Sequence, residues 1–237
     1  MIKEAMAYLL ELKRELLVEV AQRNYSTGSL LPVKEPERER FEFHTLSGLL
    51  DWTESDDVEE CFIQVVNWKS VVATGKLFGD FKQREVFASA SLIEHDAFPF
   101  GRYLELEEFI IKLQCYFVDS TAKKALIDML AKIDTAEVIQ SEDDGIAQKV
   151  VTKNEINRRA KTDVAPIVDL RPYRTFLEVD QPRSPFLIRM QHVKGDLPSA
   201  ALFEADGGAW KISAISNIAR LLEKETEHNT KVLKVFS

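Results

Sequence analysis

The sequence has little of what marks a secreted or membrane-spanning protein. Its 237 residues include two cysteines, Cys61 and Cys115, with no CxxC pair and no zinc-ligand spacing. Each cysteine lies in an apolar run, where we expect a small, buried hydrophobic side chain. The chain has no run of about 18 apolar residues, and acidic residues interrupt the apolar stretch at its N-terminus, unlike the core of a secretory signal. These absences predict a cytoplasmic protein with no membrane partner.

The familiar motifs of catalysis are missing as well. The sequence contains no phosphate-binding Walker loop, no nucleophile elbow and no HExxH zinc motif. Its four histidines are scattered, and the segment Glu94 to Asp96 supports either a carboxylate-oriented imidazole or a solvated loop histidine. A formal net charge of -8 disfavours non-specific attraction to DNA or to an anionic membrane. We therefore predict no catalytic residue, no metal and no cofactor.

What the sequence does contain is a regular succession of helix-like and strand-like segments. The hydrophobic fraction of 45% and the charged fraction of 30% are ordinary for a folded globular protein. The patterns predict these elements: an amphipathic helix over 2–22, a strand over 41–44, a helix capped by Thr45 or Ser47, a three-stranded antiparallel meander over 61–93, two helices over 106–117 and 122–133, strands over 136–140, 146–152, 164–170, 174–179, 186–190 and 200–204, a helix after Gly208, and an edge strand over 231–236.

These elements predict an α+β fold with antiparallel sheets in two blocks. A central helical hairpin, an N-terminal amphipathic helix and a C-terminal helix complete the expected fold. Three regions are predicted: a docking or oligomerisation helix over 1–24, an α+β region over 25–135 and a β-rich region over 136–237.

The segment LFEADGGAWK, residues 202–211, combines two acids, two glycines and a tryptophan at a strand-to-helix junction. Carboxylates two residues apart on a strand point to the same side, as a divalent metal would require. Open amides at a helix start would suit an anion instead. The alternative is a structural corner, in which Asp206 caps the helix. The candidate residues are Glu204, Asp206, Gly207, Gly208 and Trp210.

A second candidate site is a group of basic residues within an acidic chain. Arginines beside an aromatic residue could hold phosphates while a base stacks. The alternative is a solvated connector followed by a strand whose arginines pair with nearby Glu178 and Asp180. The residues that would contact nucleic acid are Arg158, Arg159, Arg171, Tyr173 and Arg174.

The predicted N-terminal helix must bury its apolar stripe on its own chain or on another. We expect it to act in self-association or in docking on a partner. The residues of this interaction helix are Ile2, Met6, Leu9, Leu16 and Leu17.

Several phrases of the chain resemble the YfdQ-like family of phage and prophage proteins. The most specific are LRPYRTFLEVDQPRSPFLIRMQ and ALFEADGGAWKISAISNIARLLE. FEFHTLSGLLDW, FPFGRYLELEEFIIKLQCYFVDS and SEDDGIAQKV are similar to its other parts, so the resemblance spans about residues 25–223. It implies a phage accessory protein in the host cytoplasm and carries over no catalytic residue.

Three functional hypotheses follow from these observations. The first is a non-enzymatic protein that self-associates, as a homo-oligomer, and engages a host or phage protein, either to tune DNA metabolism or to block host defence. The second is a nucleic-acid-binding accessory factor of phage recombination that uses the basic residues. The third is a metal-dependent hydrolase centred on Glu204 and Asp206.

Overall fold

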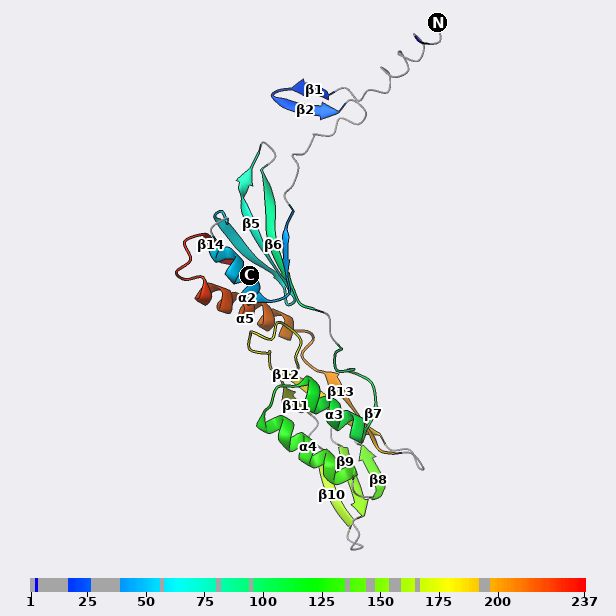
Figure 1. The fold of residues 1–237 in the computed structure, drawn as a ribbon. Coiled ribbons are helices and arrows are strands. Elements are labelled where there is room, and N and C mark those ends of the chain that lie inside the picture. The colour runs from blue at the N-terminus through cyan, green and yellow to red at the C-terminus, as the bar shows by residue number, and fades with distance from the viewer. Residues whose placement is uncertain are drawn as a thin grey trace. The chain divides into compact units, whose positions relative to one another are not determined.

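The computed structural model describes residues 3, 17–26, 39–55, 58–79, 82–93, 96–134, 137–143, 148–153, 159–164, 167–191 and 197–237. Over these residues the fold is α+β and its sheets are mostly antiparallel, as the sequence predicted (Figure 1). The chain divides into two compact units, Met1–Glu39 and Arg40–Ser237. Within the described residues, no helix is long and apolar enough to cross a membrane.

The helix predicted over 2–22 is wrong in its C-terminal part. Strands β1 (Leu17–Val20) and β2 (Arg23–Ser26) form an antiparallel hairpin there, so Leu17 is a strand residue. The two turn residues, Ala21 and Gln22, have φ angles of 52° and 62°. This backbone matches a tight hairpin turn and cannot continue a right-handed helix. Lys3 is helical, whereas Ile2, Met6, Leu9 and Leu16 lie outside the described residues.

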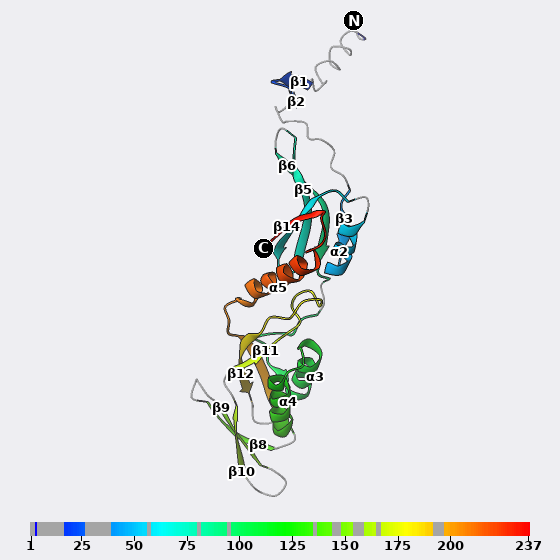
Figure 2. The ribbon, with the colours of Figure 1, turned by 90° about the vertical axis from the view of Figure 1, so that its left-hand side faces the viewer.

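The second unit contains a five-stranded sheet in the order β14-β4-β5-β6-β3. Its antiparallel centre confirms the predicted meander, while β3 and β14 pair in parallel at the two edges (Figures 1 and 2). Helices α2 and α5 pack on one face, because their leucines and isoleucines share a core with the alternate residues of the strands. The elements are β3 (Phe41–Phe43), α2 (Leu46–Glu54), β4 (Cys61–Asn67), β5 (Ser70–Phe78), β6 (Gln83–Ser91), α5 (Trp210–Glu225) and β14 (Val232–Phe236).

Helix α2 has two independent caps at its start. The Thr45 hydroxyl accepts the Gly48 amide at 3.1 Å, as the sequence predicted. The Glu178 carboxylate accepts the amides of Leu46 and Ser47 at 2.9 and 2.8 Å. This distant acid satisfies donors that a single local cap would leave unpaired.

Between β6 and α5 the chain builds a second core. A four-stranded sheet in the order β11-β12-β13-β7 packs against α3 and α4, and a separate three-stranded antiparallel sheet has the order β10-β9-β8. The elements are β7 (Leu104–Glu105), α3 (Leu106–Tyr116), α4 (Thr121–Asp134), β8 (Glu137–Asp143), β9 (Gln148–Lys153), β10 (Arg159–Val164), β11 (Ile167–Leu170), β12 (Ser184–Gln191) and β13 (Ser199–Glu204).

Both cores draw on both of the regions predicted as 25–135 and 136–237. The core under the five-stranded sheet joins residues of β4 to residues of α5, and the second core joins α3 to β12. The predicted division at residue 135 therefore separates segments that pack together. The two cores alternate along the chain, because Phe176 and Val179 of the first core lie between segments that form the second.

The strand predicted over 174–179 is a turn-containing segment instead. The buried side chain of Gln181 takes the place of a neighbouring strand. Its oxygen accepts the amides of Arg174 and Thr175 at 3.0 and 3.3 Å. Its nitrogen donates to the carbonyls of Phe176 and Val179 at 2.9 and 3.3 Å. The amide side chain of Gln181 thus provides hydrogen-bond partners for the backbone of this loop. The apolar side chains of the loop enter the core of the five-stranded sheet.

The two cysteines differ in environment. Cys61 is fully buried in the five-stranded sheet, as predicted, and burial raises its pKa to about 11. Cys115 is exposed, although it was expected to be buried. The apolar run around Cys115 forms α3, whose 3.6-residue period turns this position away from the core.

Candidate functional site

The corner at the start of α5 includes a residue that the sequence assigned to the other candidate site. The Arg174 guanidinium donates to Glu204 at 2.5 Å and to the Ser184 hydroxyl at 2.6 Å. The Arg174 side chain is only 8% exposed, so it is largely removed from solvent. Burial lowers the pKa of Arg174, and the charges of Glu204 and Asp206 oppose that shift. The arginine is held as an internal cation.

Aromatic rings complete the surroundings of this cation. The Arg174 guanidinium lies 4.1 Å from the centroid of the Trp210 ring. The centroids of the Trp210 and Trp68 rings are 5.6 Å apart, and the two rings pack in a T-shaped arrangement. Lys211 places its Nζ 4.6 Å from the Trp68 centroid. Trp68 belongs to the turn between β4 and β5, and its carbonyl accepts the Thr175 hydroxyl. This arrangement joins the two cores of the second unit.

Asp206 serves the local backbone. Its carboxylate accepts the amides of Gly208 and Trp210 at 2.9 and 3.3 Å, and Gly207 and Gly208 have φ angles of 60° and 86°. Left-handed backbone of this kind favours glycine, which explains the adjacent pair. Burial acts to raise the pKa of Asp206, but the hydrogen bonds from these amides and from Ser184, with the charge of Arg174, outweigh it and lower the pKa.

The corner therefore has the geometry of a structural joint. The Glu204 carboxylate is paired with a buried arginine, and the Asp206 carboxylate accepts the amide of Gly208 in the turn and that of Trp210 at the start of α5. A metal would have to compete with both sets of bonds. Across the described residues, no cluster of three or more histidine, cysteine, aspartate or glutamate side chains could hold a metal ion.

Of the five predicted nucleic-acid residues, the structure describes the side chains of Arg171, Tyr173 and Arg174. Arg158 lies outside the described residues, and Arg159 lies in β10. Arg171 and Tyr173 are half-buried on the segment after β11. Arg174 is committed to Glu204, thirty residues away, and not to the neighbouring acids that the sequence suggested.

Tyr173 instead helps to line an open pocket of about 570 Å³. The other lining residues are Asp96, Cys115, Tyr116 and Leu177, so the pocket is largely apolar with a thiol at its wall. Leu177 is 69% exposed. This pocket lies beside a loop and α3, and of its lining residues only Tyr173 belonged to a predicted site.

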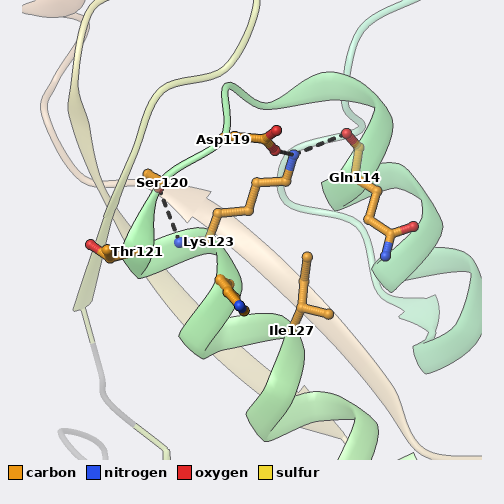
Figure 3. Close-up of a pocket in the computed structure, with 7 residues that line it drawn as sticks. Gln114, Asp119, Ser120, Thr121, Lys123 and Ile127 are labelled. Atoms are coloured by element: carbon orange, nitrogen blue, oxygen red, sulfur yellow. Dashed lines mark hydrogen bonds and ion pairs between the residues drawn. The ribbon is translucent and has the colours of Figure 1, made fainter.

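A second pocket, of about 680 Å³, lies at the junction of α3 and α4 (Figure 3). Its buried Lys123 ammonium donates to the carbonyls of Gln114 and Phe117 and to the Asp119 carboxylate at 3.0, 2.8 and 2.8 Å. The lysine holds the pKa of Asp119 below its ordinary value through a hydrogen bond and its charge. The Ser120 hydroxyl accepts the Lys123 amide and caps α4. All three ammonium donors have acceptors, so Lys123 links the C-terminal end of α3 to the start of α4.

The remaining candidate is the side of the five-stranded sheet that faces away from α2 and α5. Cross-strand partners share a face, so the register identifies its members. Phe62 lies opposite Thr74 and Lys234, and Gln64 lies opposite Val72 and Phe236. We call this surface the outer face and define it by Glu42, Phe62, Gln64, Val66, Val72, Thr74, Arg84, Val86, Ser89, Lys234 and Phe236.

The outer face leaves large apolar side chains in contact with solvent. Phe236 is 42% exposed and Val66 is 50% exposed, and the Phe62 and Phe236 rings lie 5.9 Å apart. In an antiparallel sheet with one solvated face, polar residues usually alternate with the buried ones. The strand CFIQVVN departs from that alternation, because Phe62 and Val66 lie opposite the core face. That departure is the signal by which the sequence could have marked this surface.

No family model, curated protein or solved structure matches the chain. The resemblance to the YfdQ-like family therefore remains a prediction. The outer face is the feature on which a functional proposal can be built.

Proposed function

We propose that this chain is a phage-encoded accessory protein of the host cytoplasm that self-associates and acts by binding a host or phage protein. The phage context is supported by the sequence resemblance alone. The binding role is supported by the outer face, where aromatic and aliphatic side chains stay in contact with solvent on a regular sheet. Contiguous apolar surface of this kind commonly marks an interaction site.

The alternatives have less support in the geometry. Nucleic-acid binding through Arg174 would require this arginine to leave Glu204 and a buried ring environment. Metal-dependent hydrolysis at Glu204 and Asp206 would require both carboxylates to exchange their present partners. Binding through the outer face requires no such rearrangement.

The proposal is tested by recovering partners of the full chain from phage-infected cells. A Phe62→Ser/Phe236→Ser variant should lose the recovered partner, because it removes the two aromatic rings of the outer face. An Ile212→Ser variant is the matched control, because Ile212 is 71% exposed on α5 and lies outside the outer face. Circular dichroism checks that each variant is folded.

If the Phe62→Ser/Phe236→Ser variant recovered the partner as well as the Ile212→Ser control does, the proposed function would be contradicted. Light scattering on the same proteins tests self-association, and deletion of residues 1–22 should lower the oligomeric state if the predicted N-terminal docking element acts in it. An unchanged mass after this deletion would count against that role.

A further inference from the structure

The aromatic pair of the outer face carries two cations. The Arg84 guanidinium lies 4.7 Å from the Phe62 centroid, and the Lys234 Nζ lies 5.0 Å from the Phe236 centroid. Arg84 also donates to the Gly75 carbonyl at 2.9 Å, which fixes its position on the sheet. Two positive charges thus lie directly beside the aromatic rings of the outer face.

These two cations differ from the other basic residues around the sheet. Lys76 is paired with Glu60, and Arg40 is paired with Glu42 at 3.0 Å. Neither Arg84 nor Lys234 takes part in any ion pair between described residues. The chain has a net charge of -8, yet no carboxylate of a described residue forms an ion pair with either of these two side chains.

We infer that the outer face binds an acidic, apolar segment of a partner protein. This inference rests on the proposed function and names the chemistry of the partner. Apolar side chains of the segment contact Phe62, Phe236 and the valines between them. Its carboxylates pair with Arg84 and Lys234, whose charges become less hydrated as the apolar contact forms.

A nucleic acid is also anionic, but the surface suits it less well. Each ring already has a cation over it, whereas stacking of a base requires an open ring face. A groove that follows a phosphate backbone uses many basic residues, and a net charge of -8 opposes that approach. The acidic protein segment satisfies both the cations and the aliphatic surface.

The test uses the full chain and three labelled ten-residue peptides. All three alternate phenylalanine and valine at the apolar positions, and they carry glutamate, glutamine or lysine at the polar positions. Fluorescence anisotropy should show that the glutamate peptide binds about tenfold more tightly than the glutamine peptide, with affinity falling as salt rises. The lysine peptide should bind more weakly still.

Charge reversal identifies the surface that is responsible. The Arg84→Glu/Lys234→Glu variant should lose about tenfold in affinity for the glutamate peptide and gain affinity for the lysine peptide. The Arg220→Glu/Lys224→Glu variant changes the net charge equally on α5 and should bind as the unchanged chain does.

Several results would overturn the inference. Equal or tighter binding of the glutamine or lysine peptide to the unchanged chain would exclude an acidic preference, and so would an absence of binding to all three peptides. Binding of a twenty-nucleotide oligothymidine that the Arg84→Glu/Lys234→Glu variant abolishes would assign the face to nucleic acid. Self-association lost in that variant would assign it to a second copy.

The two experiments distinguish failure of this inference from failure of the proposed function. If partner recovery still depends on Phe62 and Phe236 while the peptides show no acidic preference, the outer face binds protein of another chemistry. If partner recovery does not depend on these rings, the proposed function itself fails.

Discussion

Replacing Asp206 by alanine tests whether the corner is a structural element. The change removes the acceptor of the Gly208 and Trp210 amides, whose donor-acceptor distances are 2.9 and 3.3 Å. It also removes the partner of the Ser184 hydroxyl and a nearby charge of opposite sign to Arg174. The loss of helix capping alone costs about 1 kcal/mol, and the unsatisfied neighbours bring the expected total to about 1–2 kcal/mol of unfolding free energy.

The loss should be visible in thermal unfolding. For a unit of roughly 200 residues, about 2–4 °C of Tm accompanies each kcal/mol, so Asp206→Ala should lower Tm by about 2–8 °C at pH 7. Glu223→Ala on the exposed face of α5 is the matched control and should change Tm little. An Asp206→Ala variant as stable as the control would refute a capping role.

The pH dependence separates the charge of Asp206 from its shape. The folded-state pKa of Asp206 is lowered, so its ionised form contributes stability that is complete above the ordinary pKa of about 3.9. That contribution is lost as the pH falls below about 3.9 and through the folded-state pKa. The difference between the unchanged chain and Asp206→Asn should therefore shrink between pH 5 and pH 3 in urea unfolding. A difference that stays constant over this range would contradict the ionic contribution.

Three further predictions concern buried groups. A thiol reagent should modify only Cys115 in the folded chain, because burial raises the pKa of Cys61 to about 11; rapid release of two equivalents of chromophore would be inconsistent with this burial. Gly75→Ala should lower the unfolding free energy by about 1–3 kcal/mol in urea, because the added Cβ would lie 2.6 Å from the Phe87 ring; a neutral effect would show that this ring moves freely. Arg174→Met should cost about 2 kcal/mol, below the range for a fully buried ion pair because the partner carboxylate is partly solvated; calorimetry showing increased stability would argue against the internal cation.

Short-range patterns in the sequence correctly indicated several elements. The meander over 61–93 follows from β-branched and aromatic residues interrupted by turn residues, and β4, β5 and β6 occupy it. The cap at Thr45, one of the two that the sequence offered, depends on residues three positions apart. Such signals act within one turn of the chain, so they can be read without tertiary structure.

The wrong secondary-structure predictions concern short apolar segments whose residue pattern is compatible with more than one conformation. Residues 17–22 match a helical stripe, yet they also alternate as a strand, and the left-handed turn at Ala21 and Gln22 decides for the hairpin. Residues 174–179 have the composition of a strand, but the side chain of Gln181 satisfies their backbone. In both places propensity alone was ambiguous, since hydrogen-bond partners determine which conformation is stable.

The candidate sites show the same division between local and distant causes. The sequence by itself determined the α+β class and the positions of many helices and strands, and for Asp206 it offered helix capping beside metal or anion binding. Only the tertiary structure decided that Arg174 pairs with Glu204 and that β14 pairs with β4 at the edge of the five-stranded sheet. It also decided that Phe62 and Phe236 share a solvent-exposed face. Asn229 donates to Thr53 across 176 residues of sequence. Burial and pairing at such separations depend on how the elements pack, and local pattern contains no record of that packing.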